Sequence, residues 1–115
     1  MLAVIFEFEP YADKTQDYMD LAAELGRELE HIDGFISIER FESLTQPGKR
    51  LSLSFWRDED AISAWRNLEQ HRAAQQAGRN GIFAGYRLRV AEIIRDYSLT
   101  QRDAAPDDSN IRHGV

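Results

Sequence analysis

The chain has 115 residues, a formal net charge of −6, 43% hydrophobic residues and 30% charged residues. This length is typical of a single domain, and the hydrophobic content is high enough for a packed core, which excludes a disordered chain. The absence of cysteine excludes disulfides, thiolate metal sites and a cysteine nucleophile.

Charge and hydropathy patterning also argue against several partners. Acidic residues are interspersed among the arginines, so the dense basic stripe of a nucleic-acid-binding protein is missing. No apolar run approaches the ~18–20 residues that cross a bilayer. The first strand-like segment carries Glu7 and Glu9 instead of the basic start and apolar stretch of a secretory signal. We therefore expect a soluble, cytoplasmic protein with neither a nucleic-acid nor a membrane partner.

The first third of the chain changes from a strand pattern to a helix pattern. Residues 1–9 alternate with a period of two, which predicts a strand whose one face carries Leu2, Val4, Phe6 and Phe8. Pro10 ends this strand because it lacks a backbone donor. Residues 14–32 repeat apolar side chains every three or four positions, which predicts an amphipathic helix. Asp33 and Gly34 then stop the helix.

The middle of the chain has the pattern of a hairpin. Residues 35–41 alternate, with Ile36 and Ile38 on one face and Phe35, Ser37, Glu39 and Phe41 on the other. Residues 45–49 contain Pro47 and Gly48, which are typical turn residues. Residues 50–56 alternate again and predict the second strand of the hairpin.

The remaining chain predicts one more helix and one more strand. Asp58 is a suitable N-cap for a helix that runs to about residue 76. An apolar loop follows over residues 81–85, and residues 86–97 read as the last strand. The alternation slips at residues 92–94, which suggests a bulge.

The predicted order is β-α-β-β-α-β, an α+β fold of the ferredoxin-like type with a four-stranded antiparallel sheet and two helices on one face. Neither alternating face of the strands is clearly polar, although a sheet with one bare face should expose polar residues there. We therefore expect a homodimer that packs sheet to sheet. Residues 1–98 form the predicted domain, and residues 99–115 form a polar tail that is disordered or packed on the dimer mate.

Three stretches of the sequence together resemble the antibiotic biosynthesis monooxygenase (ABM) domain family. They are the segment from Phe55 to Arg66 (FWRDEDAISAWR), its continuation over residues 69–75, and the strand-like residues 86–92. The resemblance extends over about residues 1–98 and implies a dimeric α/β barrel with a pocket between sheet and helices in each subunit. Some members of the family oxygenate phenols or quinols without metal or flavin, others degrade haem, and others have no known activity.

The resemblance implies one candidate site residue, Trp65, and the residue types and positions around it give the others. Trp65 matches the family's pocket tryptophan, whose indole N–H would stabilise a substrate anion, and His71 is a candidate base or proton shuttle. The candidates for substrate binding are Arg72, Gln75, Phe83 and Tyr86. All of these except Gln75 have a structural alternative: core packing for the three aromatic residues, a surface position for His71, and a salt bridge for Arg72.

Haem degradation is disfavoured by two positions. Gln75 stands where the haem-degrading members carry an iron-ligating histidine, and Val4 stands near the place of their asparagine. His31, His71 and His113 are too far apart to suggest a metal site. We expect neither metal nor cofactor.

Three hypotheses about function stay open after this reading. The first is a cofactor-independent monooxygenase that uses O2 to oxidise an aromatic phenol or quinol. The second is a small-molecule-binding dimer of the same fold without catalysis. The third is an interaction protein whose pocket is filled by Phe6, Phe35, Phe55 and Phe83.

Overall fold

The computed structural model describes residues 1–75 and 81–113, with side chains described for residues 1–68 and 81–112. The elements along the chain are β1 (Leu2–Pro10), a short 3-10 helix η1 (Ala12–Lys14), α1 (Thr15–Leu29), β2 (Phe35–Glu42), β3 (Arg50–Trp56), α2 (Glu59–Gln75), β4 (Phe83–Glu92) and α3 (Asp107–His113). Among the described helices, none combines the length and hydrophobicity needed to cross a membrane.

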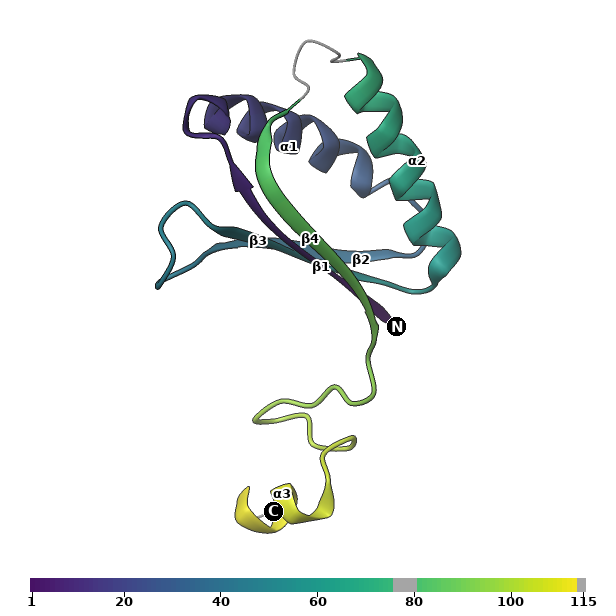
Figure 1. Cartoon of the computed structure of the whole chain (residues 1–115). Helices are drawn as coiled ribbons and strands as arrows, with labels where there is room; N and C mark the ends of the chain where they lie inside the picture. The colour runs from purple at the N-terminus through teal and green to yellow at the C-terminus, as the bar shows by residue number, and fades with distance from the viewer. Residues whose placement is uncertain (76–80, 114–115) are drawn as a thin grey trace.

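The four strands form one antiparallel sheet in the order β2-β3-β1-β4, and α1 and α2 lie on the same side of it (Figure 1). The predicted ferredoxin-like arrangement is therefore confirmed. Strand β4 begins earlier and ends earlier than the alternation suggested. Phe83 already pairs with Pro10, and Glu92 pairs with Leu2, beyond which β1 offers no further strand partner. The register shift lies between Glu9 and Pro10 instead of at residues 92–94.

A bulge in β2 corrects one prediction about faces. The register between β2 and β3 shifts between Phe35 and Ser37, so the simple alternation fails at this point. Phe35 therefore packs on the helix side with Ile38, and its ring lies 5.3 Å from that of Trp56, centroid to centroid. Ile36, in the bulge, is exposed.

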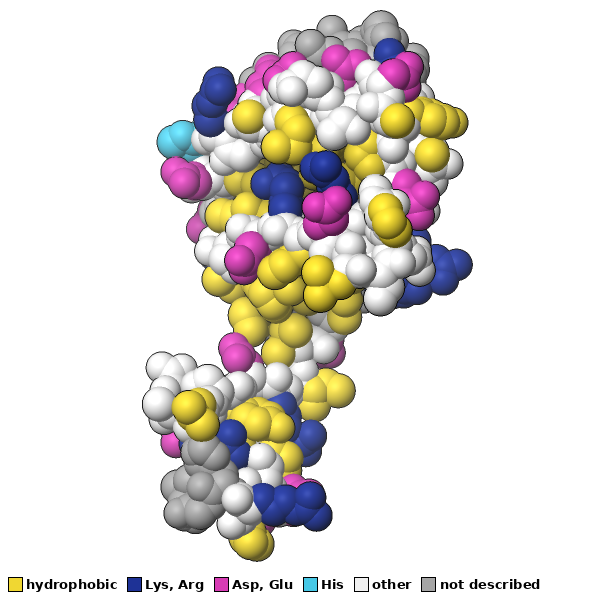
Figure 2. Space-filling model, turned by 90° about the vertical axis from the view of Figure 1, so that its left-hand side faces the viewer, with side chains coloured by type: hydrophobic (Ala, Val, Ile, Leu, Met, Phe, Trp, Pro, Cys, Tyr) yellow, Lys and Arg dark blue, Asp and Glu magenta, His cyan; other side chains and the backbone are white. Residues whose placement is uncertain are grey.

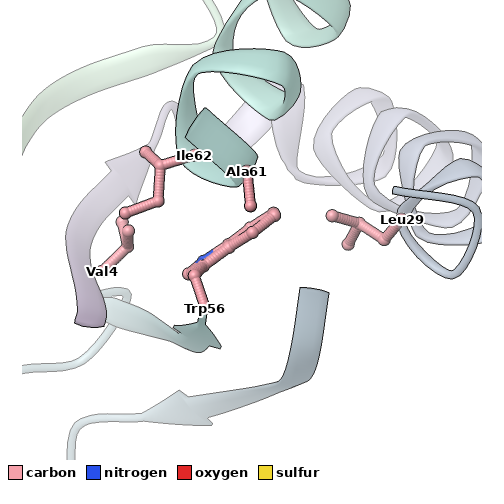
Figure 3. Packing of buried hydrophobic residues seen from close by; sticks show 5 residues of the cluster. All are labelled: Val4, Leu29, Trp56, Ala61 and Ile62. Atoms are coloured by element: carbon pink, nitrogen blue, oxygen red, sulfur yellow. The ribbon is translucent and has the colours of Figure 1, made fainter. Parts of the chain in front are cut away.

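The core at one end of the sheet is built around Trp56, the last residue of β3. Its side chain is fully buried and packs with Val4 and with residues of both helices, Leu29 of α1 and Ala61 and Ile62 of α2 (Figure 3). The indole Nε1 donates a hydrogen bond to Ser54 Oγ at 2.9 Å, so the buried polar atom is satisfied. Truncating a buried tryptophan to alanine typically costs ~3–5 kcal/mol, so Trp56 is a main anchor of both helices.

The tight turn after α1 is joined to the start of α2 by Arg57. The Arg57 backbone N–H donates to the Gly34 carbonyl at 2.8 Å, and its guanidinium donates to both carboxylate oxygens of Asp33 and to one of Asp58. The hydrogen bonds from Arg57 are the main reason why the pKa values of the Asp33 and Asp58 carboxyl groups are lowered. The other Asp58 oxygen accepts from the Ala61 N–H at 3.0 Å, which confirms the predicted N-cap.

The C-terminal segment extends away from the sheet and helices (Figure 1). It has internal order centred on Arg102, whose guanidinium donates to Ser109, Asn110 and the Ser98 carbonyl. The same guanidinium lies over the ring of Tyr97, 5.1 Å from its centroid. These contacts hold α3 against the preceding turns.

Gly34 offers a direct test of how closely α2 approaches this turn. Gly34 and Gly48 both have positive φ, 93° and 83°, so alanine at either site carries a backbone penalty of ~1–2 kcal/mol. Only at Gly34 would the added Cβ also meet another residue, at 2.7 Å from Ala61 Cβ. We expect Gly34→Ala to lower the free energy of unfolding by at least ~1 kcal/mol more than Gly48→Ala. Urea unfolding measures this difference, and equal losses would contradict the close approach.

Candidate functional site

A cavity of about 250 Å³ lies between the sheet and the helices. Figure 2 shows a hollow on the side of the molecule that carries α1 and the hairpin of β2 and β3. Hydrophobic side chains line it, and basic side chains lie within it. The cavity is therefore accessible from solvent as well as largely apolar.

The floor of the cavity is formed by two rows of residues that run across the strands. Strand register aligns the first row through β2, β3, β1 and β4, and its members are Arg40, Ser52, Phe6 and Leu88. The second row lies two residues further along each strand, and its members are Ile38, Ser54 and Val4. The first row changes from polar residues in the hairpin to apolar residues in β1 and β4, whereas in the second row Ser54 lies between two apolar residues.

The roof of the cavity is one stripe of α1. Tyr18, Leu21, Ala22 and Leu25 line it, and their spacing of three and four residues brings them to the same helix face. Trp65 from α2 and the segment from Gly81 to Phe83 complete the walls. The amphipathic pattern of α1 thus serves the cavity as well as the core.

Two hydrophobic clusters explain why the space stays open. One is the Trp56 cluster (Val4, Leu29, Trp56, Ala61 and Ile62), which fixes the end of α1. The other combines Phe8, Tyr18 and Ile82, with Phe83 packed against it, and fixes the beginning of α1. Between them the facing residues include Ser52, Ser54 and Ala22, whose side chains are too small to fill the gap. Protein interiors contain few spaces larger than a water molecule, so an apolar space of this size is a candidate ligand site.

The polar groups of the cavity gather toward β2 and β3. Arg40 Nε donates a hydrogen bond to the hydroxyl oxygen of Tyr18 at 3.1 Å. Ser52 and Ser54 are buried, and the Ser54 hydroxyl oxygen accepts from Trp56. The cavity therefore has one cationic, hydroxyl-bearing side and otherwise apolar walls, which is the usual composition of a small-molecule site.

The structure brings some of the predicted site residues to this cavity and leaves others apart. Trp65 and Phe83 line it, and the Trp65 ring lies 6.2 Å from that of Trp56. Tyr86 is outside the lining and 70% exposed, with its ring near that of Phe83. The side chains of His71, Arg72 and Gln75 lie outside the described residues, so their roles stay predictions.

Sequence reasoning missed Arg40, Tyr18 and the two serines as cavity residues. Alternation alone places Arg40 on the same face as Ile38, so a signal for it existed in the sequence. What the sequence did not reveal is which face of the hairpin the helices cover. The side chains described in the structure include no group of three His, Asp or Glu residues placed to hold a metal ion.

The hypothesis of a filled pocket depended on four phenylalanines. Phe6 and Phe83 line the cavity without closing it, and Phe35 belongs to the packing around Trp56. Phe55 pairs with Ala3 and Ser37 on the opposite face of the sheet. Their positions leave a space that a ligand can enter.

Comparison with known proteins gives one family and several relatives. The family model for antibiotic biosynthesis monooxygenase matches residues 1–77. A jasmonate monooxygenase of Pyricularia oryzae is 46% identical over 93 residues, which are 81% of this chain. The chain spans only 43% of that relative's length.

Solved structures share the fold at low sequence identity. The protein Rv0793 of Mycobacterium tuberculosis has a TM-score of 0.70 and 20% identity, with 84% of this chain and 98% of the other covered. The haem-degrading protein MhuD of the same organism has a TM-score of 0.62 and 20% identity, with 85% and 100% covered. At this identity the likeness concerns the fold alone.

A substitution in the roof tests whether small molecules enter this space. Ala22→Leu should fill part of the cavity and weaken binding of 1-anilinonaphthalene-8-sulfonate, a fluorescent probe with apolar rings and one sulfonate, by about tenfold or more, because buried ligand area is lost. The neighbouring Ala23 is exposed, so Ala23→Leu provides a matched control that should bind as the parent does. Equal binding by both variants would place the probe elsewhere.

Proposed function

The chain belongs to the antibiotic biosynthesis monooxygenase family, and on that premise we propose that it is a monooxygenase whose small, largely apolar substrate occupies the cavity under α1. The observation that carries this proposal is the open cavity of about 250 Å³ with few polar groups. This volume lies just below the ~300 Å³ at which pockets for drug-sized ligands begin. A substrate of small volume is therefore favoured.

The first candidate substrate is a phenol or quinol that supplies its own electrons. Loss of a proton gives an anion that reduces O2. Two hydrogens then leave the substrate, one oxygen atom enters it as a carbonyl, and the other leaves as water. In this chemistry the protein provides an apolar site, a donor for the anion and a base. We assign the donor role to the Trp65 indole and the base role to His71, and no metal or cofactor is required.

A second candidate follows from the relative named as a jasmonate monooxygenase, which is 46% identical. A jasmonate-type substrate has no phenol to supply electrons. Inserting one oxygen atom into its C–H bond while the other becomes water consumes two electrons from an added donor, such as a reduced nicotinamide. The two candidates therefore differ in whether O2 uptake depends on an external reductant.

Haem degradation stays the disfavoured alternative. Val4 lies in the cavity floor, and its aliphatic side chain offers no hydrogen bond to a bound oxygen species. Gln75 stands where the haem-degrading members carry their histidine. The remaining alternative is a protein of the same fold that binds a small molecule without oxidising it.

We also propose that the functional unit is a cytoplasmic homodimer. The sheet face opposite the helices carries Ile5, Leu51, Leu53, Phe55 and Phe41, aligned by strand register. Charged residues flank this apolar centre, with Glu7 paired to Arg89 at 3.3 Å and to Lys49 at 3.6 Å. An apolar centre with a polar rim is typical of an interface. A second copy would cover this face, and the tail at residues 99–115 would pack on it.

Oxygen uptake tests the catalytic proposal. The chelator-treated protein is mixed with hydroquinones and anthrone-type phenols, and separately with jasmonic acid with and without NADPH. We expect uptake above the spontaneous rate with one of these sets. Trp65→Phe should reduce the rate by about 100- to 1,000-fold, because removing a donor to a developing oxyanion has effects of this size.

Two controls separate the outcomes of this assay. A melting curve shows whether Trp65→Phe still folds, since Trp65 also packs against the core. Quenching of tryptophan fluorescence without oxygen uptake would favour the binding protein. If the compounds cause neither oxygen uptake nor a change in tryptophan fluorescence, the proposal is contradicted.

Light scattering tests the dimer. The parent chain should have about twice its monomer mass of 13.3 kDa. Leu53→Glu should give the monomer, because it buries a charge in the apolar centre. Leu44→Glu, in the fully exposed turn between β2 and β3, is the matched control and should leave the dimer intact. A monomeric parent chain at micromolar concentration would exclude sheet-to-sheet pairing.

A further inference from the structure

We propose that the cavity selects an apolar monocarboxylic acid and that Arg40 binds the carboxylate. This inference rests on the proposed function, because it concerns the substrate class of the same cavity. Arg40 is the cationic residue among those described around the cavity. It lies in the floor row directly beside Ser52, on the side where the polar groups gather.

The guanidinium of Arg40 is oriented by the protein. Its Nε donates to the hydroxyl of Tyr18, whose side chain is 6% exposed and belongs to the cluster at the beginning of α1. A hydrogen bond through Nε sets the plane of the guanidinium and leaves the two terminal nitrogens as donors. Among the described side chains, neither terminal nitrogen has a hydrogen bond or an ion pair.

The two terminal nitrogens match a carboxylate in geometry and charge. A guanidinium presents parallel N–H groups that bind both oxygens of a carboxylate. A monoanion neutralises one arginine, whereas a phosphate dianion would leave excess charge in an otherwise apolar cavity. The Ser52 hydroxyl, buried beside Arg40, adds a further donor. Desolvating a carboxylate is costly unless such partners are present, so the arrangement favours a ligand that brings this group.

The rest of the floor row suits the remainder of such a ligand. From Arg40 the row continues through Ser52 to Phe6 and Leu88. Strands lie ~4.8 Å apart, so Leu88 in β4 is on the order of 14 Å from β2. Phe83 and Trp65 add apolar walls. A molecule with a carboxylate at one end and a hydrocarbon body of this length would match the cavity from end to end.

The competing interpretation is that Arg40 only covers apolar surface with its stem and keeps its charge in water. A second arginine on the same sheet face makes the two interpretations separable. Arg50 lies two residues nearer the hairpin turn than Ser52, in the next pair on this face, opposite Glu42. It contacts Met19 and is outside the cavity lining. A general effect of positive charge would involve both arginines, whereas a carboxylate site involves Arg40.

Paired acids and methyl esters test the proposal without turnover. The probes are jasmonic acid with methyl jasmonate and decanoic acid with methyl decanoate, titrated by tryptophan fluorescence. We expect at least one acid to bind about 10- to 100-fold more tightly than its ester, the range expected for hydrogen bonds to a charged group. Arg40→Gln should remove this preference and leave ester binding within about threefold. Arg40→Lys should restore part of it, since lysine keeps the charge but not the paired geometry.

The controls make each failure distinct. Arg50→Gln should preserve the preference for the acid, and melting curves verify that every variant folds. Equal binding of acid and ester, no binding of either acid, or equal effects of the two arginine substitutions would overturn the role of Arg40. Because the fluorescence titrations measure binding in the absence of oxygen, their results do not depend on whether the protein consumes oxygen. If the protein prefers the acid but shows no oxygen uptake, the monooxygenase proposal is overturned and the role of Arg40 stands.

Discussion

The structure depends on how α1 is attached to the sheet. The helix packs on the sheet at both of its ends, and its middle stands over the cavity. At one end Leu29 packs on the buried Trp56, and at the other Tyr18 packs on Phe8. Between these anchors Ala22 of the helix faces Ser52 and Ser54 of the sheet. Hydrophobic burial at the two ends stabilises the fold, while small side chains in the middle keep a cavity. The cavity is therefore a consequence of the packing and is compatible with a stable core.

The same sheet presents two different surfaces because its strands alternate. On the helix side the hairpin contributes Arg40 and the serines to the cavity. On the other side it contributes Leu51, Leu53 and Phe55, which none of the described helices covers (Figure 1). A shift of one residue in register would exchange these sets. The proposed ligand site and the proposed dimer face thus both depend on one strand register.

The sequence predicts the fold well because its periods are strong. The element order and the Asp58 N-cap follow from local patterns that tertiary packing does not override. Phe35 was assigned to the wrong face because a bulge is invisible in a simple alternation. The site was harder to predict, since Arg40 and Tyr18 are brought together only by the packing of α1 on β2. Which face of the hairpin the helices cover depends on long-range packing, and no local pattern encodes it.

The central claim is that the space under α1 is the ligand site, and methyl NMR tests it most directly. Decanoic acid is added to protein with labelled Ile, Leu and Val methyl groups. The account predicts that the methyl signals of Val4, Leu21, Leu25, Ile38 and Leu88, which line the cavity, shift with a common affinity. Those of Ile5, Leu51 and Leu53 on the opposite face should stay unchanged. Shifts confined to the opposite face would contradict the account.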